Sequence, residues 1–428
     1  MSQPRLLIIS HVWPFPGSAG QQLRVRHILA AAVRSFQVDF LTFAPAGELA
    51  EVAGRLAALG CQPLVLETCS TGGGLKRLAR SLAAGLFILR TGLKASNYTI
   101  GKLEFSSARI QSVLSPGDYD AVLYEYFHAS DTASIFRSAG VPTVLDMHNV
   151  LWKSRAERLN ERTAWPVWFQ KFSLRRYRRQ EELAWDQFEA LVAINRSEHT
   201  LVQARLRPGQ QLFYAPMGTD LSRWPACWQP VSPPRLAYYG GLGSAHNEAA
   251  ALRCHERIMP LVWLRFPDAE LWLVGSHPTE RLHRLASDPR VKVTGFVEEV
   301  QEVLKTMSLV LCPWSGNYGF RSRIVEVMAL GVPVVATPAA VDGMELESGR
   351  GIVLVESDAA MAEQTLRLLL LPEELKAQSR LARSEMQRLY SLENTYDRLM
   401  AELRNWLPAR HTPARPPVAG PGRASGRL

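Results

Sequence analysis

The chain lacks the features that mark secreted, disulfide-bonded or zinc-binding proteins. Its five cysteines are odd in number and scattered, and no two of them have C-x-x-C spacing: Cys61, Cys69, Cys227, Cys254 and Cys312. This pattern argues against a disulfide framework and a structural zinc site, and it fits a reducing cytoplasm. The start, MSQPRLLIIS, has neither the basic residues nor the long apolar stretch of a signal peptide. No uncharged apolar run reaches about 18 residues, so we expect no membrane span.

Nucleic-acid motifs are also missing, although the chain is basic. The net charge is +9 and the pI is near 9.5, which favours acidic partners: nucleic acid, anionic lipid surfaces or phosphate-bearing substrates. The sequence contains no zinc finger, no RNP-like aromatic motif and no compact basic strip, so we expect no nucleic-acid partner. Anionic lipid surfaces and phosphate-bearing substrates therefore remain as the candidate acidic partners.

The hydrophobic pattern predicts two similar halves. At 428 residues the chain is too long for one ordinary core, so we expect two domains of about 200 residues. Short, continuous apolar runs alternate with helical patterns, as is typical of strands buried on both faces of a parallel sheet. The expected strands are residues 6–10, 38–43, 64–67, 121–126, 143–147, 191–195 and 212–215, then 236–240, 271–275, 291–295, 309–313, 333–337 and 352–355. The pattern predicts an α/β protein with two Rossmann-like domains.

Composition also indicates the domain boundaries. We expect an N-terminal domain at 1–215 and a C-terminal domain at 235–390, joined by a hinge at 216–234 that is dense in proline and tryptophan. Residues 408–428 have almost no large apolar side chains, so we expect a disordered tail.

The strand at 309–313 leads into the most informative stretch, which contains Gly316, Gly319 and Phe320 and then Arg321, Arg323 and Glu326. Strand, glycine loop, helix and strand is how α/β proteins build an anion site, because unpaired N–H groups at a helix start attract phosphate. Two arginines add charge-assisted hydrogen bonds. The glutamate can accept hydrogen bonds from sugar hydroxyls, so the set suits a nucleotide-diphosphate sugar.

Two basic, amphipathic segments interrupt the α/β rhythm, at residues 75–89 and 153–188. One interpretation is surface helices packed on the sheet, with ion pairs between residues four apart such as Arg178 and Glu182. The other is a patch, including residues 171–179, that contacts anionic lipid or a lipid-linked acceptor.

From about residue 5 to residue 406 the chain resembles the GT-B fold retaining glycosyltransferases of family 4, the glycosyl transferases group 1. The resemblance is carried, in order, by HVWPFPGSAGQQLRVRHI, VLDMHNVLWKSRAERL, LFYAPMGTD, LAYYGGLGSAHNEAA and the block from GFRSR to GVPVVAT. It implies an acceptor domain followed by a nucleotide-sugar donor domain. It also implies that a last helix, within 391–407, crosses back onto the N-terminal domain.

The resemblance also assigns site residues. The donor-binding positions are Gly17, Gly20, Arg24, Gly241, Gly319, Phe320, Arg321, Arg323 and Glu326. The candidate catalytic residues are His148, Glu125 and His128, with Asp146 and Asn149 on the acceptor side. The resemblance implies no essential metal ion and no cofactor beyond the nucleotide-sugar co-substrate. Asp146 and His148 are near neighbours, but no second pair lies at a convincing metal-ligand spacing.

Two departures from the family pattern matter. The family has a Glu-x7-Glu pair, and here Tyr318 stands where the first acid is expected, ahead of Glu326. GGLGSAHNEAA lacks the usual basic pair, so we infer that Arg321 and Arg323 supply the charge for the diphosphate. The alternatives are that both arginines only cap surface carboxylates, that Glu326 only pairs with Arg323, and that His128 is structural.

The leading hypothesis is a glycosyltransferase that moves a sugar, with retention, from a nucleotide-diphosphate sugar to a glycan or lipid-linked acceptor. Surface polysaccharide or glycolipid synthesis would be its setting, in the cytoplasm or at the inner face of the plasma membrane. One alternative is a nucleotide-sugar epimerase of the same fold, which Tyr318 in place of an acid disfavours. The other is a non-catalytic nucleotide-sugar binding protein, which the missing acid and basic pair leave open.

Overall fold

Two parallel sheets form the framework of the protein. The computed structural model describes residues 3–17, 19–69, 75–157, 166–315 and 320–407. The first sheet contains β1 (Arg5–Ile9), β2 (Gln37–Ala44), β3 (Gln62–Glu67), β4 (Ala121–Glu125), β5 (Thr143–Asp146), β6 (Ala190–Ala193) and β7 (Gln211–Tyr214). The second contains β8 (Arg235–Tyr239), β9 (Glu270–Val274), β10 (Val291–Gly295), β11 (Leu309–Cys312), β12 (Val334–Ala336) and β13 (Ile352–Leu354). Every expected strand is present, so the predicted fold class is confirmed.

The strand orders are those of doubly wound sheets. They are β3-β2-β1-β4-β5-β6-β7 and β10-β9-β8-β11-β12-β13, and every pairing is parallel. In each sheet the order reverses beside the first strand, where β1 meets β4 and β8 meets β11. Such switch points open a crevice at the carboxyl ends of the strands, which is where α/β proteins bind ligands.

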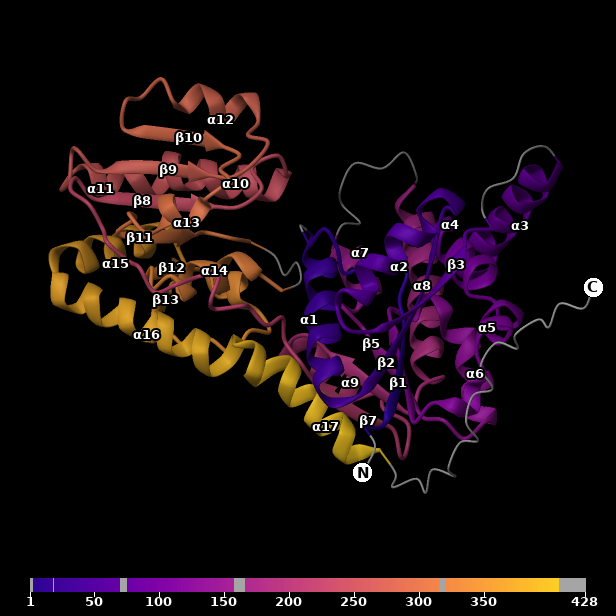
Figure 1. Ribbon diagram of the computed structural model, residues 1–428. Coiled ribbons are helices and arrows are strands. Elements are labelled where there is room, and N and C mark those ends of the chain that lie inside the picture. Colours follow the sequence, from indigo (N-terminus) through magenta and orange to yellow (C-terminus); the bar gives the residue numbers. More distant parts are fainter. Residues whose placement is uncertain (1–2, 18, 70–74, 158–165, 316–319, 408–428) are drawn as a thin grey trace, which may run out of the picture.

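Helices cover both faces of each sheet (Figure 1). Those of the N-terminal half are α1 (Gly20–Ser35), α2 (Leu49–Ala57), α3 (Leu75–Thr91), α4 (Ala95–Tyr98), α5 (Ser107–Val113), α6 (Ala133–Ser138), α7 (Leu151–Glu157), α8 (Val167–Trp185) and α9 (Arg196–Gln203). Those of the C-terminal half are α10 (Ala245–Arg253), α11 (Met259–Trp263), α12 (Glu280–Leu285), α13 (Val300–Leu304), α14 (Ser322–Ala329), α15 (Asp358–Leu370) and α16 (Pro372–Tyr390). The strands are continuous apolar runs because both of their faces are buried; in β4 all five residues are buried.

The chain returns to the N-terminal half at its end, as predicted. After α16 come the π-helical turn η7 (Glu393–Asp397) and α17 (Arg398–Trp406), which reach across to α1 and β7 (Figure 1). Tyr396, Leu399 and Leu403 belong to the core cluster that contains β1 and α1. Burial of these side chains fixes the crossover, since each buried large apolar side chain contributes about 1.5–3 kcal/mol.

Polar contacts also join the halves beside α9. Arg196 donates its backbone N–H to the Gly343 carbonyl at 2.8 Å, and its guanidinium lies 2.8 Å from Glu345. Gly343 has φ +72°, and a Cβ there would lie 2.7 Å from Asn195 Oδ1, the cap of α9. The predicted domain boundaries stay predictions, and the predicted disordered tail at 408–428 lies outside the described residues. None of the described helices is both long and apolar enough to cross a bilayer.

Candidate functional site

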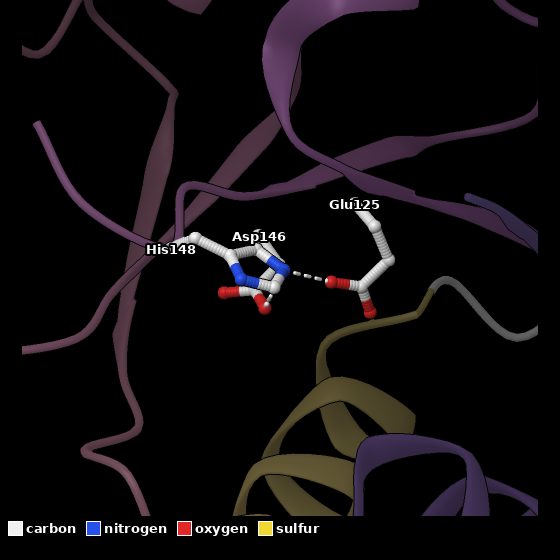
Figure 2. A group of neighbouring side chains, drawn as sticks. All are labelled: Glu125, Asp146 and His148. Atoms are coloured by element: carbon white, nitrogen blue, oxygen red, sulfur yellow. Dashed lines mark hydrogen bonds and ion pairs between the residues drawn. The ribbon is translucent and has the colours of Figure 1, made fainter. Parts of the chain in front are cut away.

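Three polar side chains meet at the carboxyl edge of the N-terminal sheet. Glu125 ends β4 and Asp146 ends β5, and the two residues are directly opposite in the parallel pairing. His148 follows two residues after Asp146 with φ +58°, a left-handed conformation that few non-glycine residues adopt. Its Nε2 lies 2.5 Å from Glu125 Oε2 and 3.5 Å from Asp146 Oδ2 (Figure 2). All three side chains are buried.

Arg24, from α1, completes this cluster. Its Nε and Nη2 donate to the two oxygens of Asp146 at 2.7 and 2.6 Å, and Nη1 donates to the Ala215 carbonyl at 3.0 Å. Only 1% of Arg24 is exposed. These contacts indicate that Arg24 holds Asp146 in place. Direct binding of the donor by Arg24 stays a prediction.

Burial and neighbouring charges give the ionisable side chains of this cluster different protonation states. Burial raises the pKa of Glu125 well above its ordinary value, and the negative charge of Asp146 raises it further. Burial would also raise the pKa of Asp146, but Arg24 outweighs it and holds that pKa below its ordinary value. Burial lowers the pKa of His148 to about 4. At neutral pH the site thus holds one ion pair, Arg24 with Asp146, beside a neutral carboxyl and a neutral imidazole.

The aromatic rings beside this cluster connect it to His128. Tyr126, at φ +71°, stacks on the His148 ring with centroids 4.0 Å apart. The His128 ring lies 5.4 Å from Tyr126 and 4.9 Å from His11. The structure therefore brings together His128 and His148, two candidates from separate motifs, and their catalytic roles stay predictions. Sequence reasoning missed His11 and Tyr126, although each follows a strand that ends at this edge.

Burial favours the neutral form of His128, which can be tested by stability measurements. Burial lowers the pKa of His128 to about 3, from about 6.5 in the unfolded chain. Between these values the unfolded state binds a proton that the folded state does not, so this histidine makes stability fall as the pH falls. His128→Gln should remove up to about 1.4 kcal/mol per pH unit of that dependence. Urea unfolding at pH 7.5, 6, 5 and 4.5 checks it, with the exposed His283→Gln as control; parallel curves for His128→Gln and the wild type would contradict it.

The same three residues form the one group with metal-ligand geometry that we find in the described parts of the chain. One ligand atom from each of Glu125, Asp146 and His148 lies within 4.8 Å of the others. Glu125 supplies the third neighbour that the sequence did not reveal. A cation would fit poorly, because Arg24 already engages both oxygens of Asp146 and the neutral Glu125 would have to ionise. The expectation that no metal is needed stays a prediction.

A second group of predicted residues lies at the start of α14 in the C-terminal half. Arg323 Nη1 donates to Glu326 at 2.7 Å and to the Tyr239 hydroxyl at 2.6 Å, and Tyr239 also donates to Glu326 at 2.9 Å. About half of the Arg323 side chain (53%) is exposed. Pairing of Glu326 with Arg323, one of the alternatives considered above, thus occurs here. It leaves the guanidinium of Arg323 accessible to an anion.

Arg321 precedes Arg323 but has a different environment. Its guanidinium stacks over the Trp314 ring at 3.9 Å and donates to the Ala339 carbonyl at 3.2 Å, with 8% of the residue exposed. Phe320 packs against Tyr390, with ring centroids 5.5 Å apart. The predicted donor residue Gly319 and the substituted position Tyr318 lie outside the described residues.

The remaining predicted residues lie in loops at strand ends. Gly241 follows β8, and its carbonyl accepts from Asn247 Nδ2 at 2.7 Å. Gly17 has φ +87°. Gly20 begins α1, and a Cβ there would lie 3.5 Å from Met217 of the predicted hinge. Asn149 adjoins His148, and its Oδ1 has no hydrogen-bond partner among the described residues.

Comparison with known proteins identifies the family. Residues 19–218 match the model of the glycosyl transferase 4-like domain, and residues 233–370 match that of the glycosyl transferases group 1. No curated protein matches the sequence significantly.

Several solved structures share the fold. Sucrose-phosphate synthase from Thermosynechococcus elongatus is 16% identical, with a TM-score of 0.62 over 95% of this chain and 99% of that one. Anabaena HepE in complex with UDP and glucose is 15% identical, with a TM-score of 0.58 over 95% of this chain and 100% of that one. A glycosyltransferase from Rickettsia africae is 12% identical, with a TM-score of 0.60 over 95% and 99%. The chain therefore belongs to the group 1 glycosyltransferases of GT-B fold and is a sugar-transferring enzyme.

Proposed function

We propose that this enzyme transfers a sugar, with retention, from a nucleotide-diphosphate sugar to a glycan or lipid-linked acceptor in surface polysaccharide or glycolipid synthesis. The observation that carries the donor assignment is the accessible Arg323 beside Glu326 at the start of α14. The HepE structures with UDP and with UDP-glucose support a nucleotide-sugar donor.

The leaving group explains this placement of charge. A nucleoside diphosphate departs with additional negative charge, which cations and backbone N–H groups fixed in advance can stabilise without reorganisation. Arg323 and the first N–H groups of α14 supply both kinds of donor. Glu326 then accepts from the ribose hydroxyls. This arrangement needs no divalent ion to neutralise the diphosphate.

The buried cluster of the N-terminal half serves the other substrate. A neutral His148 can exchange hydrogen bonds with a sugar hydroxyl, and Asp146 is held by Arg24 so that it orients that histidine. Glu125, kept neutral by burial, donates a hydrogen bond rather than carrying charge.

We also propose that α3 and α8 bring the enzyme to an anionic membrane surface. Leu82 of α3 is 68% exposed and Trp168 of α8 is 70% exposed. Exposed cations lie on the same helices: Arg90, Lys171, Arg175 and Arg179. Large exposed apolar residues beside cations are typical of interfacial helices. Arg178 does pair with Glu182 at 2.7 Å, so the interpretation as packed helices with ion pairs accounts for part of this surface.

The activity itself can be tested without knowing the donor. A thermal-shift screen of nucleotide sugars should find ligands that raise the melting temperature, because a ligand of the native state stabilises it by RT ln(1 + [L]/Kd). Incubation of those donors with the enzyme and acceptor candidates should then yield a sugar-bearing product. Conversion of the donor sugar to its epimer would identify an epimerase, and binding without any turnover would indicate a non-catalytic protein.

The two arginines give a sharper test. Arg321→Ala and Arg323→Ala should each weaken binding of the nucleoside diphosphate by about 1.5–3 kcal/mol, the range for hydrogen bonds to charged groups. Titration calorimetry with UDP and GDP measures this effect, with the exposed Lys292→Ala of β10 as the matched control. Unchanged affinity in both arginine variants would remove them from the donor site. A loss in only one would assign the diphosphate to that residue.

A further inference from the structure

A large cavity lies between α3, α4, α7 and α8 in the N-terminal half. Its volume is about 840 Å³, and its apolar lining includes Leu89, Leu93, Leu151, Phe169, Phe172 and Tyr177. Cavities of about 300–1,000 Å³ with mostly apolar walls are the size class that binds small organic ligands. A neighbouring cavity of about 600 Å³ shares Leu93, Asn97 and His128 with it.

The walls of the large cavity are held by close packing and hydrogen bonds. Gly92, after α3, has φ +72°, and a Cβ there would lie 2.5 Å from the carbonyl oxygen of Ser173 in α8. Arg155 of α7 donates to the Gly92 carbonyl at 2.7 Å and to Ser173 Oγ at 3.0 Å. These contacts join α7, α8 and the segment after α3 around the apolar cavity. The cavity is therefore part of the packed structure of this domain.

One residue of the cavity lining, His128, is among the candidate catalytic residues. The Tyr126 ring contacts both His128 and His148, with ring centroids 5.4 and 4.0 Å away. Lys94 also lines the cavity, is exposed, and forms no ion pair among the described residues. The positive charge of Lys94 contributes to the lowered pKa of His128, which agrees with their proximity.

Exposed apolar side chains line this cavity and the neighbouring one. Leu86 and Leu89 of α3 are 59% and 64% exposed, and Phe172 of α8 is 46% exposed. These residues line the two cavities and also face solvent. α3 lies at the side of the N-terminal half away from the C-terminal sheet (Figure 1).

We propose that this cavity binds the acceptor, and that the acceptor is a phosphate-bearing lipid. Its hydrocarbon chain occupies the space between α3 and α8, its phosphate contacts Lys94, and the group that receives the sugar points past His128 toward His148. An apolar chain matches the lining and an anion matches the unpaired ammonium. The inference rests on the proposed function, because it names the acceptor class of the same enzyme.

The probe for this test is dodecyl phosphate, used as a monomer below its aggregation concentration. Calorimetry should give one binding site on the wild-type enzyme, and neither inorganic phosphate nor monomeric dodecyl maltoside should compete effectively. Ala95→Trp, which fills the cavity from the first residue of α4, should weaken binding at least tenfold. Lys94→Ala should weaken it by about tenfold, the loss expected for a charged hydrogen bond.

Two matched variants control for general effects. Ala57→Trp places the same ring on an exposed position of α2, and Lys292→Ala removes an exposed lysine from β10. Neither should change the affinity for dodecyl phosphate. Equal weakening by Ala57→Trp and Ala95→Trp, or no one-site binding by the wild type, would overturn the proposal.

Two further measurements separate this inference from the others. The Ala95→Trp variant should still sediment with anionic vesicles, because surface contact by α3 and α8 does not need the cavity. If Ala95→Trp leaves dodecyl phosphate binding intact while vesicle binding persists, the apolar surface serves membrane contact and the cavity proposal fails.

UDP and GDP should bind Ala95→Trp and Lys94→Ala normally. Dodecyl phosphate binding without any nucleotide binding by the wild type would refute the donor assignment instead.

Discussion

Arg24→Met should destabilise the enzyme by about 3–5 kcal/mol, the cost of breaking a buried ion pair on one side only. Arg24 and Asp146 are 1% and 0% exposed, and the two hydrogen bonds between them are 2.6 and 2.7 Å long. Removing the guanidinium leaves the Asp146 carboxylate without its cation in a low-dielectric site beside Glu125. The shift of the urea midpoint for the N-terminal half measures the loss.

Arg26→Met is the matched control, because Arg26 is exposed on the same helix only two residues away. It should change stability by no more than about 0.5 kcal/mol, as is usual for surface positions. The double variant Arg24→Met with Asp146→Asn should lose less than the sum of the single variants, since residues in one network couple. If the two losses in the free energy of unfolding simply add, Arg24 and Asp146 do not stabilise the protein as a pair.

His148→Asn should lower turnover at least about 100-fold, the lower end of what a positioned proton-transferring or hydrogen-bonding side chain contributes. Asparagine tolerates the left-handed backbone at φ +58°, so this variant removes the imidazole with little added strain. Donor affinity should change much less than turnover, because the charged donor contacts that we propose, Arg323 and Glu326, lie on α14. Initial rates and calorimetric donor affinity, measured with the nucleotide sugar identified by thermal shift, give the two quantities separately.

Glu125→Gln is the informative comparison for this experiment. If Glu125 is neutral at working pH, as its raised pKa indicates, glutamine preserves its charge and shape and turnover should fall less than tenfold. A loss as large as that of His148→Asn would mean that the Glu125 proton itself moves in the reaction. Normal turnover in His148→Asn would make the histidine structural.

The positions of the strands in this protein could be predicted directly from the sequence. Continuous apolar runs locate the strands because a parallel strand must be apolar on both faces, and the observed ends differ from the expected ones by no more than two residues. The candidate residues at strand ends follow from the same reasoning, since parallel strands end at one edge. The pairing of Arg178 with Glu182 also needed only local spacing.

What the candidate side chains do depends on contacts between distant segments. The resemblance of its loop to the family assigns Arg24 to the donor, and this stays a prediction. Its ion pair with Asp146, 122 residues away, becomes visible only when α1 packs against the sheet. Glu125 and His148 become neighbours through the pairing of β4 with β5, and burial, which no local pattern gives, then sets their charge states.

The sequence by itself determined the two α/β halves, the order of strands and helices along the chain and the family, because periodicity and motif order are local properties. The tertiary structure alone decided which polar groups are ionised, which arginine is accessible and where an apolar cavity lies beside His128. These depend on burial and on close approach between segments far apart in the chain, such as Gly92 against α8. Desolvation acts on a group through everything packed around it, so its effect appears only once the whole domain is assembled.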